Sequence, residues 1–436
     1  MCTVSGELGV GELTFPFSDL HRILSFMYRS TIKACYLGSF IGALTCNLAP
    51  LLYVTFMLEF GITFEQAGRL TLLNFFTQIV TDLVFSRPVD RWGVRPFITL
   101  GHLMAFFGFL LLAFAPSLFP NNTYGGLMVA TVIYSIGGGL FELLLSAIVQ
   151  AIPNDSKEKA MSLLHSFYAW GFIVVVIGTT VGLRFFSRSN WMYVVLLWSI
   201  LPLLNFFNFL RVPLAPAVGE EHRTKIRELL SSRYFLFVLL GIAVGGATEV
   251  SMSQWTSAFV ESSLGLPKEV GDLVGLCLFA LLLGTTRAIY GAYGDKFPLY
   301  KTMLFGSVLC IVCYLVAALS PFPMLSLVAC IFSGLGSSLL WPGSVVNGAN
   351  RFPLAGSSLF AFLAAGGDAG AAFGPWMIGL IADVSPNLVR IAPWLSSLSL
   401  QESALRSGML LGTIFPILMV IFLRKMHRLD ETRMAS

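Results

Sequence analysis

The sequence predicts an all-α membrane protein in which twelve transmembrane helices form two six-helix bundles. Of its 436 residues, 56% are hydrophobic and only 11% are charged, whereas about a quarter of the residues in an ordinary soluble chain are charged. The hydrophobic residues gather in stretches long enough to cross the core of a bilayer, which takes about 20 residues of helix. A single long polar stretch divides these stretches into two sets of six.

The division of the chain follows from the order of these stretches. We expect an N-terminal segment over residues 1–33, a first bundle over 34–210, a linker over 211–233, a second bundle over 234–424 and a tail over 425–436. No signal peptide is expected, because the N-terminal segment lacks a compact apolar region followed by a small-residue cleavage site. The expected spans are 34–58, 67–86, 97–118, 125–151, 161–185, 192–210, 234–259, 271–291, 302–320, 323–346, 356–382 and 406–424.

The placement of Lys and Arg predicts the orientation in the membrane. These residues accumulate in the loops around 87–95, 157–159 and 296–301 and in the linker, and cytoplasmic loops are the ones enriched in them. We therefore expect both termini in the cytoplasm of a multi-pass monomer in the plasma membrane, with the lipid bilayer as its partner. The formal net charge of +4 follows from this arrangement. No nucleic-acid partner is expected, because there is no clustered basic face.

The two halves of the sequence repeat each other weakly. The stretch "RPVDRWGVRPFITLG" after the second span aligns with "GAYGDKFPLYKTMLFG" after the eighth, which pairs Asp90 with Asp295. The fourth and fifth spans likewise align with the tenth and eleventh. Such repetition is typical of a duplicated transporter whose binding site lies between the halves, near the middle of the membrane.

The loop "SRPVDRWGVRP" is close to the loop motif of the major facilitator superfamily, and the chain resembles that superfamily over essentially its full length. The resemblance implies that this loop latches the two halves together on the cytoplasmic side. Charge-assisted hydrogen bonds of this kind can break and re-form between two states. The alternative is an ordinary basic cytoplasmic loop. The latch residues implied by the match are Asp90, Arg91, Gly93 and Arg95, with Asp295 and Lys296 in the second copy.

The fourth span carries a polar face. Glu142, Ser146 and Gln150 recur every four residues and lie on one side of a helix. An ionisable residue inside a span costs a few kcal/mol at least, so it usually faces a cavity or a partner. The run "GGGLFELLLS" is similar to the fourth-helix signature of the fucose permease branch, in which the glutamate takes part in sugar recognition and proton coupling. The resemblance implies this role for Glu142, although Ser146 stands where the branch has Asn.

Other spans also carry polar or aromatic residues that can converge on one cavity. For Glu249, as for Glu142, the alternative is a structural pairing with Arg or Ser. Asp368 lies in a glycine ladder, Gly366, Gly370 and Gly374, that also suits tight helix packing. For His165 the alternative is a hydrogen bond to a neighbouring helix. Arg287 is expected to be an interface or latch residue. Together with Glu142 and Gln150, the candidate solute-binding and coupling residues are Asn47, His165, Glu249, Trp255, Asn347 and Asp368.

These features predict a secondary transporter that moves a small polar solute by alternating access. The solute is expected to be a sugar or sugar derivative, mainly from the resemblance, and a proton is the expected coupling ion. A carboxyl group that is removed from water favours its neutral form, so a mid-span glutamate can bind a proton on one side and release it on the other.

The sequence also bears on three other functions. The many Phe residues, 38 in all, would suit an exporter of lipophilic drugs or metabolites. A membrane ligand sensor would bind without transporting. An enzyme is not expected, because the sequence has no nucleotide loop, no metal-ligand spacing and no nucleophile paired with His and an acid. For the same reason we expect neither a cofactor nor a metal.

Overall fold

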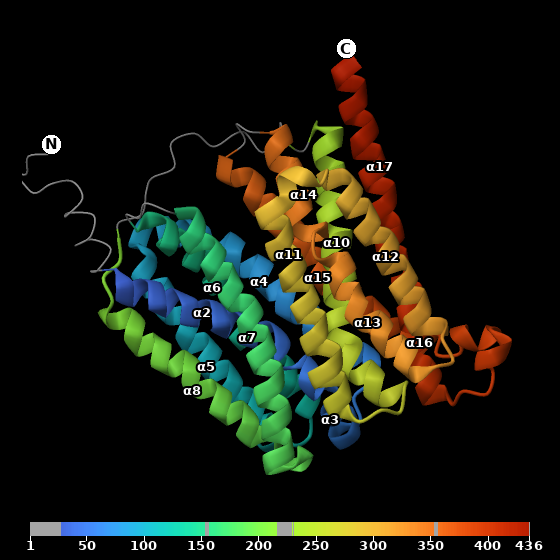
Figure 1. The fold of residues 1–436 in the computed structure, drawn as a ribbon. Helices are drawn as coiled ribbons and strands as arrows, with labels where there is room; N and C mark the ends of the chain where they lie inside the picture. Colours follow the sequence, from blue (N-terminus) through green and yellow to red (C-terminus); the bar gives the residue numbers. More distant parts are fainter. Residues whose placement is uncertain (1–27, 153–156, 216–228, 230, 353–355, 436) are drawn as a thin grey trace, which may run out of the picture.

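The computed structural model describes residues 28–152, 157–215, 229, 231–352 and 356–435, and within them the regular elements are all helices. Nine helical segments are long and apolar enough to cross a membrane, or ten if one bent pair counts as a span. The helices α4 and α15, which have polar or small residues inside the span, bring the number of spans in the described chain from ten to twelve. The predicted fold class is therefore confirmed. Figure 1 shows the two groups of helices side by side.

The first half contains six spans, and the first of them is broken. This span consists of α2, η1 and α3, which bend by 40° where Pro50 removes a backbone donor from the helix. The elements are α2 (Arg29–Asn47), η1 (Pro50–Leu52), α3 (Tyr53–Phe60), α4 (Phe64–Trp92), α5 (Val94–Leu118), α6 (Thr123–Ala151), α7 (Lys157–Phe186), η2 (Arg188–Asn190) and α8 (Trp191–Arg211).

The second half repeats this plan. Its tenth and twelfth spans are each divided into two helices, and its eighth begins with a π-helical turn, η3. The last helix continues to the end of the described chain, well past the expected end of the span at 424. The elements are α10 (Arg233–Ser262), η3 (Val270–Leu276), α11 (Cys277–Tyr293), η4 (Gly294–Lys296), α12 (Leu299–Leu319), α13 (Pro323–Ser337), α14 (Leu340–Arg351), α15 (Gly356–Val384), η5 (Leu388–Ile391), η6 (Pro393–Leu395), α16 (Leu400–Gly412) and α17 (Ile414–Ala435).

The bundle has two ends, which we name by what they carry. The linker end holds the last residue of α8 and the first residue of α10. The distal end is the opposite one, where α3 turns into α4, α7 into α8, and α10 into η3 (Figure 1). The expected cytoplasmic position of the linker end remains a prediction, and most of the linker itself, residues 216–228 and 230, lies outside the described residues.

The two halves are joined at the distal end by a cap that crosses between them. The backbone N–H groups of Phe64 and Glu65, at the first turn of α4, donate to the carboxylate of Asp383 on α15 at 3.2 and 2.7 Å. Trp376 Nε1 of α15 also donates to Glu65 Oε1 at 2.7 Å. A carboxylate at a helix N-terminus satisfies free N–H groups and interacts favourably with the helix dipole. This contact therefore fixes the distal ends of α4 and α15 against each other.

Candidate functional site

Three carboxyl groups from three helices meet inside the spans, and we call them the carboxyl cluster. They are Asp82 on α4, Glu142 on α6 and Asp368 on α15, and one oxygen of each lies within 4.8 Å of the other two. Glu142 is exposed, Asp82 is half-buried and Asp368 is only 3% exposed. Since Asp82 and Glu142 belong to the first half and Asp368 to the second, the cluster crosses the boundary between the halves.

Glycine in α6 explains why Asp82 and Glu142 come so close. A Cβ added to Gly139 would lie 2.9 Å from Thr81 Cβ and 3.0 Å from the backbone oxygen of Gln78, so only glycine lets α6 approach α4 to this distance. Asp82 and Glu142 lie about one turn further toward the linker end on the same two faces. The close approach of the backbones therefore sets the separation of the two carboxyl groups.

The packing of α15 directs the third carboxyl group, that of Asp368, toward the other two. Ala372, one turn after Asp368, packs with Phe75 of α4 in a small buried cluster. Gly370 faces α10, where a Cβ would lie 1.7 Å from the backbone oxygen of Ala243. Asp368 and Gly370 are two positions apart, which corresponds to about 200° of rotation around the helix axis, so they lie on nearly opposite sides of α15. The glycine ladder thus packs α15 on α10, while Asp368 faces α4.

The carboxyl cluster has no positive partner within the described part of the chain, where none of its three members forms an ion pair with Lys or Arg. Asp82 Oδ1 and Asp368 Oδ2 are buried and accept no hydrogen bond there. Burying unpaired charges is expensive, and like charges at this separation cannot all be ionised together. The cluster therefore needs shared protons or a bound cation, for which oxygen ligands at this spacing are also suited.

A network of amides lies beside the cluster. Gln78 Nε2 donates to Asn74 Oδ1 and to Cys46 Sγ, the latter at 3.6 Å, and Asn74 Nδ2 donates to a backbone oxygen of α2 at 2.7 Å. Tyr168 of α7 lies close enough to interact with Cys46 and Glu142. These groups fix the surroundings of the cluster and connect it to the first and fifth spans.

Gln254 of α10 bridges the two halves next to this network. Its Nε2 donates to the backbone oxygen of Cys46 at 3.2 Å and to Asn47 Oδ1 at 3.5 Å, and its Oε1 accepts from Thr71 Oγ1 at 3.2 Å. The predicted site residue Asn47 is 7% exposed and also donates to the backbone oxygen of Ala43. Asn47 therefore lies at the contact between the halves, near the carboxyl cluster.

The second predicted acid, Glu249, is paired with a cation in its own half. Arg287 Nη2 donates to Glu249 Oε2 at 2.7 Å, and Arg287 Nε donates to the backbone oxygen of Ser338 at 2.8 Å. Ser338 lies where the tenth span breaks between α13 and α14. Arg287 is thus not a contact between the halves here. It is a 38%-exposed guanidinium held against a broken helix, a setting that transporters use for their solutes.

Trp341 packs between α10 and α15, close to residues of both groups. A Cβ added to Gly246, one turn from Glu249, would lie 2.9 Å from its ring, and one added to Gly367, next to Asp368, would lie 2.4 Å away. The ring is half-buried. An aromatic ring thus lies against the helix backbones beside Glu249 and Asp368.

Other predicted site residues lie elsewhere. Gln150 is exposed on the same face of α6 as Glu142. Trp255 is fully buried, donates to the backbone oxygen of Pro375 at 2.8 Å and packs on Tyr53, so in this state it belongs to the contact between the halves and no ligand can reach it. Asn347 donates to Met303 Sδ at 3.6 Å, within the second half. The structure does not bring Asn347 to the carboxyl cluster.

The described latch residues bind within their own halves. Arg95 donates to the backbone oxygens at the end of α8, at distances of 2.7 to 3.1 Å, and thereby satisfies carbonyl groups that a helix end leaves free. Lys296 lies 5.3 Å from the centre of the Tyr293 ring. Arg91 and Gly93 are exposed. The side chains of Asp90, Asp295 and His165 lie outside the described residues.

Sequence reasoning did not single out Asp82 and Gln254. A lone carboxylate inside the second span was a usable signal for Asp82. Gln254 had no signal of its own, because an uncharged amide inside a span becomes informative only when its partners are known.

Comparison with known proteins agrees with this architecture. The model of the Major Facilitator Superfamily matches residues 35–375. An uncharacterised transporter of this type from Yersinia pestis is 24% identical over 300 residues, which are 68% of this chain and 74% of that protein. The multidrug resistance protein MdtH of Blochmanniella floridana is 25% identical over 202 residues, and the match spans 44% of this chain and about half, 47%, of that protein.

Solved structures share the fold at low sequence identity. A bacterial homologue of the human lysosomal transporter Spinster, inward-facing and occupied, superposes with a TM-score of 0.74 at 15% identity, over 92% of this chain and 97% of that one. A D-xylose–proton symporter gives 0.67 at 14% identity over 89% and 97%, and the transporter FucP in an outward conformation gives 0.60 at 16% identity over 92% and 99%. The chain therefore belongs to the Major Facilitator Superfamily and is a membrane transporter rather than an enzyme.

Proposed function

We propose that this transporter moves a small polar solute, a sugar or sugar derivative, in symport with protons, and that the carboxyl cluster is the coupling site. One observation carries the proposal. Three carboxyl oxygens from both halves lie within 4.8 Å of one another without a cationic partner in the described chain. Such a group needs protons or another cation to be stable where it is.

The position of the cluster supplies a way to couple protons to movement. Asp368 moves with the second half, whereas Asp82 and Glu142 move with the first. When the halves rock against each other, the separation of these carboxyl groups changes, and with it the free energy of holding a proton between them. Proton binding and release are thereby linked to the exchange between states, as alternating access requires.

The solute would bind between the carboxyl cluster and the Glu249–Arg287 pair. Trp341 offers an aromatic face there, and Arg287 has further N–H donors beyond the two that bind Glu249 and Ser338. An aromatic face with a few polar donors and acceptors suits a hydroxyl-rich ligand. The sugar class is further supported by the resemblance to the fucose permease branch and by the fold shared with a xylose–proton symporter.

The proposal includes the predicted setting. The protein would act as a monomer in the plasma membrane with its linker end and both termini in the cytoplasm. The loop of Asp90 to Arg95 and its second copy at Asp295 and Lys296 would join the halves at that end when the distal end opens.

A second candidate is an exporter of lipophilic compounds. It is favoured by the match to the relative named as a multidrug resistance protein and by the 38 Phe residues. The two candidates differ in the compounds that stabilise the purified protein, because binding to the native state raises apparent stability. Thermal unfolding across sugars, polyols, nucleosides and drugs would separate them.

The coupling role is tested with Glu142→Gln in proteoliposomes, using a solute found in that panel. The amide keeps the shape and much of the hydrogen bonding but cannot release the proton. Counterflow exchange should remain, while accumulation driven by a pH gradient should be lost. Glu431→Gln is the matched control, because Glu431 is exposed near the end of α17, away from the cluster.

Full gradient-driven accumulation by Glu142→Gln would reject this role for Glu142. Accumulation that follows an imposed sodium gradient instead of a pH gradient would reject the proton as the coupling ion. Binding of the solute without any exchange in the wild-type protein would reject transport of that compound.

A further inference from the structure

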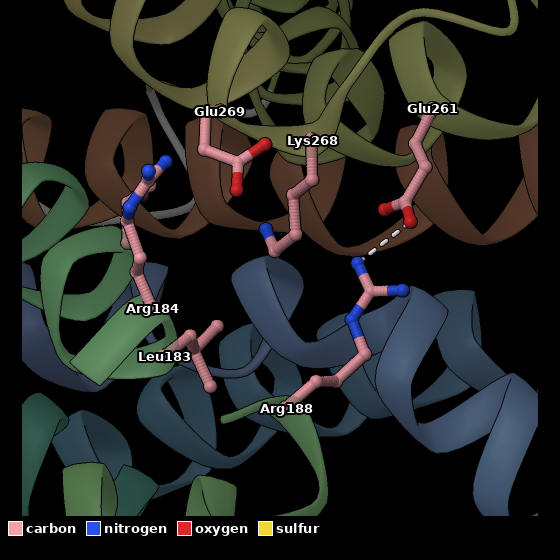
Figure 2. A pocket seen from close by; sticks show the side chains of 7 residues that line it. Leu183, Arg184, Arg188, Glu261, Lys268 and Glu269 are labelled. Carbon is pink, nitrogen blue, oxygen red and sulfur yellow. Dashed lines mark hydrogen bonds and ion pairs between the residues drawn. The ribbon is translucent and has the colours of Figure 1, made fainter. Parts of the chain in front are cut away.

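A pocket of about 290 Å³ lies at the distal end of the bundle (Figure 2). Its walls come from α7 and η2 of the first half and from the end of α10 and the turn before η3 of the second. Sites for small ligands begin at about 300 Å³, so the pocket has room for one small molecule. Its lining residues are Thr180, Leu183, Arg184, Arg188, Glu261, Lys268 and Glu269.

This pocket is separate from the solute site proposed above. None of its lining residues belongs to the carboxyl cluster or to the Glu249–Arg287 pair. Glu261 follows Glu249 by twelve positions on α10, which corresponds to about 18 Å along the helix axis. Arg184 is exposed and Glu269 is half-buried, so a ligand can enter from the distal side.

The basic residues of the pocket have hydrogen-bond donors that are not used. Lys268 is only 8% exposed, and its Nζ donates to Asp272 Oδ2 at 2.7 Å and to Ser257 Oγ at 3.1 Å. One of its three N–H groups therefore remains free. Arg188 donates from Nη2 to Glu261 Oε1 at 2.6 Å, and its other N–H groups have no partner within the described chain.

Unused acceptors lie on the same walls. Glu261 Oε2 is buried and accepts no hydrogen bond from the described residues, although a buried carboxylate oxygen without a donor costs free energy. Among those residues Arg184 and Glu269 form neither an ion pair nor a hydrogen bond. Figure 2 shows Lys268 and Glu269 reaching into the space between Arg184 and Arg188. The pocket thus presents free donors and free acceptors together.

The mixture of charges indicates which kind of ligand fits. Three cations and two carboxylates line the pocket, and the buried Asp272 behind Lys268 adds a further negative charge, so the site is close to neutral. A cationic ligand would meet the basic groups, and an anionic ligand would meet the carboxylates. An uncharged ligand with several hydroxyl groups can donate to the carboxylates and accept from the cations at once.

The same lining argues against a lipophilic ligand. Leu183 is its only apolar side chain, and the lining contains no aromatic ring. Hydrogen bonds in which one partner is charged are stronger than those between neutral groups. A compact ligand with many hydroxyl groups would therefore gain more here than a larger apolar one.

We propose that this pocket is a distal subsite for an uncharged polyhydroxylated molecule, a monosaccharide or a polyol. Glu261 Oε2 and Glu269 accept hydrogen bonds from its hydroxyl groups, and Arg184 and Lys268 donate to them. That this ligand is also the transported solute rests on the proposed function, whereas the presence of the subsite does not. The subsite holds its ligand at the distal end, outside the central solute site.

Occupancy of the pocket is tested by the protection of a thiol placed in its wall. Leu183→Cys removes no polar contact, and it is combined with Cys2→Ser and Cys277→Ala. The rate of modification by a small methanethiosulfonate reagent is measured on the purified protein with and without D-glucose, D-xylose, L-fucose or sorbitol. At least one of these compounds should slow the modification severalfold. Sodium acetate and ethylammonium chloride should not slow it.

A double variant tests whether the named side chains bind the ligand. Arg184→Ala with Glu269→Ala removes two pocket side chains that have no partner in the described chain, so the fold should be kept. The concentration of sugar or polyol that gives half protection should rise by about tenfold or more. Arg424→Ala with Glu431→Ala is the matched control, because both residues are exposed on α17, and it should leave that concentration unchanged.

Protection is also measured with the central solute site altered by Trp341→Ala or by the smaller change Arg287→Lys. It should persist in both, because the ligand lies in the pocket. Loss of protection in both would show that binding at the central site acts on the thiol from a distance, and would overturn the subsite.

Three other results would also overturn the subsite. They are no protection by any of the four compounds, equal protection by the charged probes, and an unchanged half-protecting concentration in the Arg184 and Glu269 double variant. Protection by a compound that the wild-type protein does not transport would instead leave the subsite in place and count against the proposed function for that compound.

Discussion

Asp82 and Asp368 lie in opposite halves of the protein, 286 positions apart by their numbers, and still hold carboxyl oxygens within 4.8 Å of each other. Close packing of α4 against α15 produces this proximity, through Phe75 on one helix and Ala371 and Ala372 on the other. Small side chains on α15 let the helices approach, and the carboxyl groups follow. Two carboxyl groups that repel each other when both are ionised therefore lie where the two halves meet.

We predict that Asp368→Asn makes the protein less sensitive to alkaline pH. In the wild-type protein, loss of protons from the cluster creates repulsion between carboxylates, and this repulsion opposes the native packing. At an effective dielectric constant near 20 it amounts to about 3 kcal/mol for one pair of charges. The free energy of unfolding, measured in detergent in acidic and alkaline buffers, should fall less in the variant. An equal fall in both proteins would show that the cluster does not lose its protons over that range.

We predict that Gly139→Ala separates α6 from α4 and disturbs the cluster. The new methyl group would meet Thr81 and the backbone of Gln78 at 2.9 to 3.1 Å, and backbone atoms cannot move aside cheaply. Such overpacking costs about 1–3 kcal/mol. Gly284→Ala is the matched control, since its Cβ would meet no atom within 4 Å and should be neutral or stabilising by about 0.5–1 kcal/mol. The comparison is made by thermal unfolding, and equal stability of the two variants would contradict the packing argument.

We predict that Asp383→Ala weakens closure of the distal end. Asp383 accepts the N–H groups of Phe64 and Glu65 at the start of α4, across the boundary between the halves. Loss of a helix cap costs about 1 kcal/mol. This cap joins the two halves, so its loss should destabilise only the state in which the distal end is closed. The distance between nitroxide labels on Ser189→Cys and Ser397→Cys, which are exposed on opposite halves, should therefore lengthen in reconstituted protein that also carries Cys2→Ser and Cys277→Ala. Arg390→Ala, which removes bonds within the distal loop of the second half, should leave it unchanged.

We predict that Arg287→Lys lowers the affinity for the solute more than it lowers stability. A lysine can still pair with Glu249, but it lacks the planar fork with five donors that binds Glu249 and the Ser338 carbonyl and leaves further N–H groups for the solute. Loss of one such charge-assisted bond is worth about 1.5–3 kcal/mol, or roughly ten- to a hundredfold in affinity. The measurement is the dissociation constant of a solute found in the stability panel. A normal dissociation constant would place the solute away from Arg287.

The sequence alone determined the twelve spans and the duplication of the chain. Hydropathy is a local property, and a bilayer demands that each span be apolar over its own length, so these features can be predicted without knowing the packing. The polar face of α6 with Glu142 and Gln150 was predictable in the same way, because helical spacing alone puts those residues on one side.

Only the tertiary structure decided which polar groups meet. The cluster of Asp82, Glu142 and Asp368 depends on how closely α4, α6 and α15 approach, and that depends on what each glycine faces. Trp255, a candidate site residue by sequence, packs on Tyr53 of the first half in this state and so lies in the contact between the halves. Glu249 was the competing candidate to Glu142 by sequence, and only the structure shows that Glu249 is paired with Arg287. Partners on distant helices leave no periodic pattern in the sequence, so charge compensation becomes visible only when the helices are packed together.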